Sequence, residues 1–240
     1  MHNVYQLPYL NFDNHLDITG LLSIKKQISA FIALHPHLTR PTKYVGGNFT
    51  ESNSRGILDY QLEYSKHADP VIQELLAKDA FGSYIVFEES VTHGSLSLNL
   101  RYTTTGYQDK HKSANCSAVK EDAEFAFFYH WLDSQKIFSD YGRVNIFINH
   151  PGTFTHTHKD YPTDDTSVVD QFLWITFNDR KKFFLLDGEE KIYLPGYCNW
   201  FNTHNLHGTD PVEQSCYTIR VDGTFSDEFM SKVNPQFSCQ

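Results

Sequence analysis

Apolar residues recur at helical spacing in the first half of the chain. The spacing predicts a helix over residues 18–34, which ends before His35-Pro36. A second helix is expected over residues 70–80, because Asp69 is a suitable N-cap and Pro70 suits the first helical position. Both segments are of a length typical of helices in soluble domains.

The clearest helical pattern covers residues 118–137. Ser117 is placed to cap this helix, and Glu121 and Asp122 fall in its first turn, where carboxylates complement the helix dipole. One face is apolar, so we expect it to pack on a sheet. That face holds Phe125, Phe128, Trp131 and Leu132.

Elsewhere the pattern favours strands. Residues 44–65 and 84–104 are interpreted mainly as strands and turns, and the polar residues 107–117 as an exposed loop. From Arg143 onward, short apolar runs alternate with turn residues, and Asp187-Gly188 predicts a hairpin. The expected strands are Val144–Ile148, Phe172–Phe177, Lys182–Leu186, Lys191–Leu194, Tyr197–Phe201 and Cys216–Val221.

Closely spaced short strands indicate a jelly roll or a small barrel. We therefore expect a mainly β fold with flanking helices. With no internal repeat and no low-complexity linker, residues 1–240 are expected to form a single domain. In this domain a helical and mixed part, about residues 1–140, would pack on a β-barrel core of about residues 141–225.

Composition narrows the classes of function. Aromatic residues make up 15% of the chain, which suits pleated, half-buried surfaces. The formal net charge is −9, and no basic stripe is present, so we do not expect nucleic acid as a partner. The four cysteines form no CxxC pair, and no leader or membrane-spanning run is apparent. We therefore expect a cytoplasmic protein with free thiols.

The histidines are concentrated in the strand-rich half. His158 and Asp160 form an H-x-D pair, and on an extended chain side chains two apart project from the same face. His207 follows in the same half. Two histidines and one carboxylate form the facial triad that binds iron(II) and leaves coordination positions open. We therefore predict His158, Asp160 and His207 as metal ligands.

Arg220 distinguishes this chemistry from metal binding in general. It lies in an alternating run, residues 216–221, and an arginine that points into a barrel is costly unless it meets an anion. A dicarboxylate co-substrate would supply that anion, because a guanidinium can donate two parallel hydrogen bonds to a carboxylate. Thr218 shares the face of Arg220 in a regular strand and is predicted to bind the same carboxylate.

These residues resemble the 2-oxoglutarate/iron(II) dioxygenase superfamily. Leu194-Pro195-Gly196, Trp200 and His207, followed by the Arg220 strand, are similar to its aspartyl/asparaginyl β-hydroxylase-like branch. The resemblance covers roughly residues 143–225. In this chain the interval from His207 to Arg220 is longer than is usual in that branch, and residues 210–215 are a turn that can accommodate the difference.

The resemblance implies a double-stranded β-helix, a cupin-like jelly roll. It also implies iron(II), 2-oxoglutarate and O₂ as the cofactor and co-substrates, and hydroxylation of an unactivated C–H bond with release of succinate and CO₂. The ligands would be His158, Asp160 and His207, and Arg220 would anchor 2-oxoglutarate. The substrate would be a small molecule, such as an amino acid, or a peptide side chain.

Two other classes of protein remain open. His156 and His158 form an H-x-H pair, and with His204 or His207 they would make a three-histidine cupin site. A jelly-roll binding protein without enzymatic activity is the other alternative. The acidic loop 161–170 is either a lid or a solvated loop, and Arg143, Asn145 and Asn149 face either the barrel interior or water.

Overall fold

The computed structural model describes residues 7–35, 38–43, 94–103, 109–149, 151–152, 154–160, 169–177 and 183–233. For His156 and His158 it describes the backbone alone. The helix expected over residues 70–80 and the strands expected over residues 44–65 lie outside these residues.

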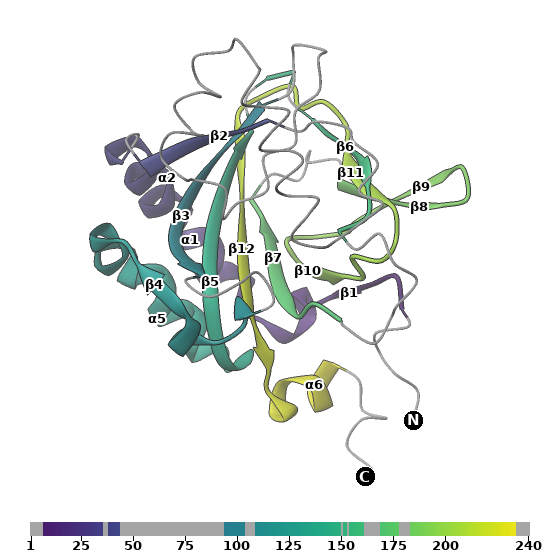
Figure 1. The fold of residues 1–240 in the computed structure, drawn as a ribbon. Coiled ribbons are helices and arrows are strands. Elements are labelled where there is room, and N and C mark those ends of the chain that lie inside the picture. The colour runs from purple at the N-terminus through teal and green to yellow at the C-terminus, as the bar shows by residue number, and fades with distance from the viewer. Residues whose placement is uncertain are drawn as a thin grey trace.

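Two antiparallel sheets form the described fold (Figure 1). The larger has the strand order β1-β10-β7-β12-β5-β3-β2, with β4 paired to β3, and the smaller has the order β6-β11-β8-β9. The bounds are β1 Tyr9–Asn11, β2 Thr39–Lys43, β3 Gly94–Thr103, β4 Cys116–Ala118, β5 Phe138–Asn149, β6 Thr155–His158, β7 Phe172–Thr176, β8 Phe183–Asp187, β9 Glu190–Tyr193, β10 Cys198–Phe201, β11 His207–Thr209 and β12 Cys216–Phe225.

The strand order is that of a double-stranded β-helix. From β5 onward the chain places β5, β7, β10 and β12 in the larger sheet and β6, β8, β9 and β11 in the smaller one, so that two packed sheets are wound together. The predicted mainly β jelly roll with flanking helices is therefore confirmed. The six strands expected after Arg143 are all present, with end points shifted by a few residues.

The sequence of β12 shows why the larger sheet has two different faces. Tyr217 hydroxyl donates to the carbonyl of Lys25 at 3.0 Å, which places this side of the strand against a helix. Residues on alternate positions project to the opposite face, where Arg220 contacts Asp222 across one intervening residue. Period-two alternation thus directs apolar side chains toward the helices and polar ones into the space between the sheets.

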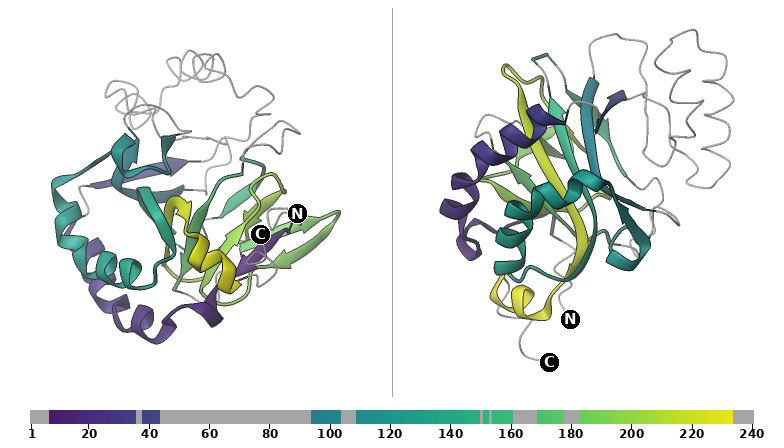
Figure 2. Two further views of the ribbon diagram at one scale, coloured as in Figure 1. Left: turned by 90° about the horizontal axis from the view of Figure 1, so that it is seen from below. Right: turned by 90° about the vertical axis from the view of Figure 1, so that its left-hand side faces the viewer.

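Helices cover the outer face of the larger sheet (Figure 2). Two short helices replace the single helix expected over residues 18–34, because the chain is interrupted at Ile24; the end before His35 is as predicted. The helical elements are α1 Ile18–Ser23, α2 Lys25–Leu34, α5 Ala126–Ser134 and α6 Asp227–Val233, with short 3-10 turns at η2 Asp13–His15, η5 Ser113–Asn115 and η6 Lys120–Phe125.

The helix predicted over residues 118–137 is only partly correct. Its first turns are the 3-10 helix η6, α5 begins at Ala126, and Ser117 belongs to strand β4 instead of capping a helix. Its predicted apolar face is confirmed, since Phe125 and Phe128 are fully buried and Phe125 packs on Phe31 of α2 at a ring distance of 5.0 Å. The burial of its apolar face stabilises this helical segment, even though its first turns are not α-helical and no serine caps them.

Asp187-Gly188 forms the predicted hairpin between β8 and β9. Asp187 pairs with Glu190, so the loop has two residues, and Gly188 adopts φ +61°, a conformation that glycine reaches without strain.

None of the described helices is long and apolar enough to cross a membrane.

Candidate metal and acid-binding site

His207 is the first residue of β11 and lies in the space between the two sheets. It is 3% exposed, and its ring packs against Phe183 and Phe201 at ring distances of 5.8 and 5.1 Å. Nδ1 lies 2.8 Å from the carbonyl oxygen of Asn205, which can only accept a hydrogen bond. In the neutral ring Nδ1 therefore carries the proton, and Nε2 keeps the lone pair that a metal ion requires.

Asp160 is the second predicted ligand, and it follows β6 in a bend instead of continuing the strand. Its backbone N–H donates to the carbonyl of Thr203 at 3.1 Å, in the turn that leads to β11. As a result, Asp160 Oδ1 lies 3.4 Å from Nε2 of His207. The structure thus brings together two of the three predicted ligands.

The third predicted ligand, His158, is described by its backbone only. Its Cα is paired directly with that of His207 across β6 and β11. Among the described side chains, no group of three His, Cys, Asp or Glu residues is arranged to hold a metal ion.

The donor atoms that are described fit a hard or borderline divalent metal. An imidazole nitrogen with the correct tautomer faces a carboxylate oxygen, and a carbonyl orients the ring from behind, as outer partners do in metal sites. Asp160 is the more accessible of the pair, with a side chain 16% exposed against 4% for His207.

Arg220 lies next to this pair, inside the fold, and is 6% exposed. Its Nη1 is 3.5 Å from Asp160 Oδ2, Nε donates to Asp222 Oδ1 at 2.9 Å, and Nη2 donates to Asp170 Oδ2 at 3.3 Å. The guanidinium also lies over the ring of Phe172, 4.1 Å from its centroid. The inward arginine is as the alternation of β12 predicts, and carboxylates of the chain itself surround it.

Two further cations complete a buried ionic cluster, which we define as Lys110, Arg143, Asp170, Arg220 and Asp222. Lys110 Nζ donates to Asp170 Oδ2 at 2.6 Å, and Arg143 Nε donates to Asp222 Oδ2 at 2.7 Å. The side chains of Lys110, Asp170 and Asp222 are fully buried. Charges this deep in a protein persist only when they are paired.

The electrostatics of the ionic cluster are strongly coupled. Burial by itself would raise the pKa of Asp222, but the nearby Arg143, Arg220 and Lys110 outweigh it and hold that pKa well below its usual range. Burial lowers the pKa of Lys110 to about 8, although Asp170 opposes this shift. Near neutral pH the three cations therefore face two carboxylates, which leaves an excess of one positive charge beside Asp160.

Polar and aromatic residues surround Arg220 and His207 in the space between the two sheets. Thr218, predicted to bind the same acid as Arg220, is fully buried one step further along the inner face of β12. Asn145 lies directly opposite Arg220 on β5 and is 4% exposed. Its Oδ1 has no hydrogen-bond partner among the described residues, which is unusual for a buried acceptor. Trp174 packs on Phe183 at 5.3 Å and closes the gap between the sheets.

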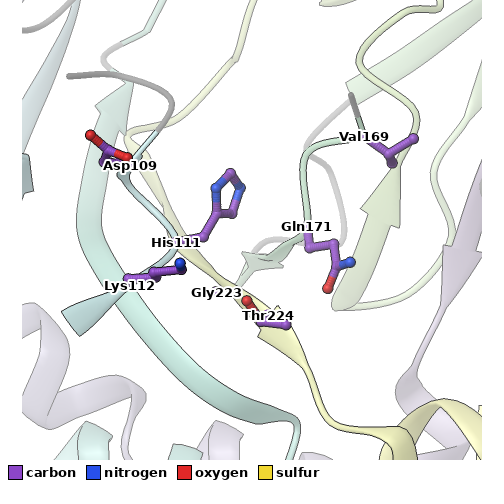
Figure 3. A pocket seen from close by; sticks show the side chains of 7 residues that line it. All are labelled: Asp109, His111, Lys112, Val169, Gln171, Gly223 and Thr224. Atoms are coloured by element: carbon purple, nitrogen blue, oxygen red, sulfur yellow. The ribbon is translucent and has the colours of Figure 1, made fainter. Parts of the chain in front are cut away.

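A polar pocket of about 270 Å³ adjoins the ionic cluster (Figure 3). In it, His111 and Gln171 stand on facing sides, and Gly223 and Thr224 of β12 lie between them. Its lining consists of sequence neighbours of the buried charges: Asp109, His111, Lys112, Val169, Gln171, Gly223 and Thr224. His111 Nε2 is 3.4 Å from Asp170 Oδ1, so this residue links the pocket to the cluster.

Two predictions made from the sequence are wrong in this region. The segment 107–117 was expected to be an exposed loop throughout; residues 109 and 112–114 are exposed, but Lys110 is fully buried and Cys116 begins a strand. Asp170 was assigned to a lid or solvated loop, but it is 1% exposed. Both errors have one cause: these two residues neutralise each other, and a partner so distant in the sequence leaves no local pattern.

The remaining candidates are placed as follows. Arg143 and Asn145 face the interior, where Arg143 contacts Asp222; Asn149 is 4% exposed. His204 is partly buried in the turn between β10 and β11, where its N–H donates to Asn202 Oδ1 at 3.0 Å. His156 belongs to β6, but its side chain is outside the part of the chain that the structure describes.

No protein-family model matches the chain, and no curated protein is similar enough in sequence to match it. Some solved structures are weakly similar. One is an oxidoreductase of the 2OG-Fe(II) oxygenase family from Burkholderia pseudomallei, with 11% identity, a TM-score of 0.37, and coverage of 75% of this chain and 94% of that one.

Another is a prolyl hydroxylase from Trichoplax adhaerens, solved in complex with a hypoxia inducible factor oxygen degradation domain peptide fragment. It has 13% identity and a TM-score of 0.36, over 95% of this chain and all (100%) of that one. An RmlC-like cupin from Desulfovibrio desulfuricans has 14% identity and a TM-score of 0.25, over 36% and 73%. Similarity this low does not define a function, so the function must be argued from the site itself.

Proposed function

We propose that this protein is an iron(II)- and 2-oxoglutarate-dependent dioxygenase of the hydroxylase type. His158, Asp160 and His207 would hold the metal, and Arg220 and Thr218 would bind the co-substrate. The observation that carries the proposal is the position of Asp160, which lies between Nε2 of His207 at 3.4 Å and the guanidinium of Arg220 at 3.5 Å. The two ligand candidates Asp160 and His207 are thus adjacent to Arg220, a cation that can bind the carboxylate of a co-substrate.

The charge of the ionic cluster supports 2-oxoglutarate as the co-substrate. In the absence of a metal ion, Asp160 offsets the excess positive charge next to Arg220. A metal ion would draw the Asp160 carboxylate to itself, and the excess charge would then favour another carboxylate at the same place. The distal carboxylate of 2-oxoglutarate has the required charge and shape for a guanidinium.

The donor set supports iron. Imidazole nitrogen combined with carboxylate oxygen suits iron(II), and three protein ligands leave room for further ligands. Iron(II) with 2-oxoglutarate and O₂ supplies the oxidation, in which one oxygen atom enters the substrate as a hydroxyl group and the other enters succinate, with loss of CO₂. Within that superfamily, the aspartyl/asparaginyl β-hydroxylase-like branch is the one that residues 194–222 resemble.

The chain's own residues contribute binding, orientation and exclusion of water. Asn205 carbonyl fixes the ring of His207, and Thr203 carbonyl fixes the backbone of Asp160. Phe183, Phe201 and Trp174 make the space beside His207 apolar, which excludes competing water. The substrate would be an amino acid, another small molecule or a peptide side chain. It would approach the metal site from the side of Asp160, whose side chain is more exposed than that of His207.

Anaerobic titration of the metal-free protein with iron(II), followed by 2-oxoglutarate, tests the proposal. We expect a weak visible charge-transfer band that requires both additions and is absent in Asp160→Ala. His156→Ala is the matched control and should keep the band. Iron binding without a band, or loss of the band in His156→Ala alone, would favour the three-histidine site. Absence of iron binding would remove the enzymatic proposal altogether.

A further inference from the structure

Lys110 is the least expected member of the ionic cluster. Its side chain is fully buried although it lies just before the short helix η5, far in the sequence from the strands that carry the predicted ligands. Nζ donates to Asp170 Oδ2 at 2.6 Å, and the same oxygen accepts a hydrogen bond from Arg220 Nη2 at 3.3 Å. Lys110 and Arg220 are therefore joined through one carboxylate oxygen.

This link restricts the orientation of Arg220. Asp222 holds Nε, Asp170 holds Nη2, and Phe172 lies against the flat face of the guanidinium. The remaining nitrogen, Nη1, points toward Asp160. If Asp170 were not held by Lys110, the guanidinium would lose one of its two fixed edges. A fixed arginine fork loses less entropy when it binds a planar anion.

Lys110 also determines the charge that an acid would meet. Lys110, Arg143 and Arg220 face Asp170 and Asp222, so the ionic cluster has one positive charge in excess. Without the Lys110 charge this excess would be zero, and Arg220 would be fully neutralised by carboxylates of the chain. The preference for an acid at Arg220 thus depends on a lysine that does not need to touch it.

We propose that Lys110, acting through Asp170, is a positioning and specificity-determining residue that makes the site select a 2-oxo acid with a second carboxylate. The inference rests on the proposed function and deepens it, because it assigns the discrimination between a dicarboxylate and a monocarboxylate to a residue outside the strands of the barrel. Arg220 would contact the distal carboxylate, and Lys110 would set the charge and the direction of that contact.

The proton on Lys110 provides a test that needs no substitution. The charged or titratable groups that act on Lys110 include Asp170 and His111 from the neighbouring segments, Arg220 and Asp222 from β12, and Arg143 from β5. Burial holds the pKa of His111 below its usual value and that of Lys110 at about 8, so Lys110 is the group that titrates in mildly alkaline solution. Affinity for the dicarboxylate should therefore fall as pH rises through about 8.

The experiment compares two ligands on the full chain loaded with manganese(II), which avoids turnover. The ligands are 2-oxoglutarate and 2-oxopentanoate, which has a methyl group in place of the distal carboxylate. Calorimetry should show that Lys110→Met weakens 2-oxoglutarate binding about tenfold or more, and changes 2-oxopentanoate binding by less than about twofold. Lys120→Met, at a lysine of η6 whose side chain is 89% exposed, should change neither.

A double variant guards against misfolding of Lys110→Met. Lys110→Met combined with Asp170→Asn removes one charge of each sign, so the excess of the ionic cluster is unchanged. The amide oxygen introduced by Asp170→Asn can still accept from Arg220 Nη2, so the wild-type ratio of the two affinities should return to within about threefold. Equal weakening of both ligands by Lys110→Met, or failure of the double variant to regain the ratio, would overturn the inference. If the wild-type protein binds neither ligand, the proposed function itself fails.

Discussion

The two faces of the larger sheet are built from the same strands but have opposite chemistry. On β12, Ile219 and Val221 are fully buried toward the helices, whereas Arg220 and Asp222 are buried toward the smaller sheet. The outer face is apolar and is covered by helical elements, of which α2 and η6 contact each other through the buried rings of Phe31 and Phe125. The inner face holds the ionic cluster, His207 and several aromatic rings.

This difference indicates that the two faces of a single strand have different roles. Burial of apolar surface stabilises a fold without specifying a chemical function, and the outer face provides it. Buried ion pairs contribute little net stability, because desolvation offsets their attraction. A strand that alternates Ile219, Arg220 and Val221 thus uses one side for stability and the other for a site.

The largest effect expected on the inner face is loss of the metal. His207→Ala should lower iron(II) affinity by more than about a hundredfold, beyond the cost of losing an outer partner of a metal ligand. His204→Ala, in the turn just before β11, should retain metal affinity within a few fold. Anaerobic iron(II) titrations of both variants measure this difference, and similar losses in the two variants would contradict the assignment of His207.

The largest effect expected on the outer face concerns stability alone. Phe128→Ala removes a fully buried ring of α5 and should lower the free energy of unfolding by about 3–5 kcal/mol. Metal affinity of the folded fraction should not change. Urea unfolding followed by circular dichroism measures the loss, with Leu34→Ala as control, because Leu34 is 71% exposed and should cost about 0.5 kcal/mol or less. A change in metal affinity in Phe128→Ala would contradict the separation of stability on the outer face from metal binding on the inner face.

Asp222→Asn should affect both stability and the site, because it leaves Arg143 and Arg220 without their shared anion. We expect a loss of about 3 kcal/mol near neutral pH. Since folding lowers the pKa of Asp222, its contribution is complete above the ordinary value of about 4 and is lost as pH falls below it. The stability difference between wild type and variant should therefore shrink in acid. A difference independent of pH would show that Asp222 acts through packing.

The smallest expected effect separates Thr218 from Arg220. Thr218→Val keeps the volume of a fully buried side chain and removes only its hydroxyl. If that hydroxyl binds the same carboxylate as Arg220, 2-oxoglutarate affinity should fall by about fivefold, equivalent to about 1 kcal/mol. Thr209→Val, on β11, provides a buried control. Equal affinities in wild type and Thr218→Val would leave Arg220 as the anchor and remove Thr218 from the site.

Much of the barrel could be predicted from the sequence, because each strand after Arg143 has its own local pattern. Alternation in residues 216–221 correctly predicts that Arg220 points inward, and Asp187-Gly188 correctly predicts a hairpin. The ends of helices were less predictable: Ile24 divides one expected helix, and Lys120–Phe125 forms a 3-10 helix where an α-helix was expected. Local spacing alone does not distinguish these cases.

The surroundings of Arg220 could not be predicted in the same way. The sequence led us to expect a co-substrate as the anion beside it, but Asp170 and Asp222 already lie within hydrogen-bond distance. Lys110 has no apolar period, turn signal or motif that indicates burial. Its position depends on Asp170, and such a contact exists only after the sheet has formed.

The separations within the ionic cluster have a consequence for folding. Lys110 and Asp170 are 60 residues apart in the chain, and Asp170 and Arg220 are 50 apart. Contacts between such distant residues form only after large loops have closed, which slows the search for the native topology. During synthesis, the ribosome releases β12 well after Lys110 and Asp170. We therefore expect the contacts of Lys110 and Asp170 with Arg220 to form only after β12 has emerged, so that a product truncated before β12 would fail to assemble the site.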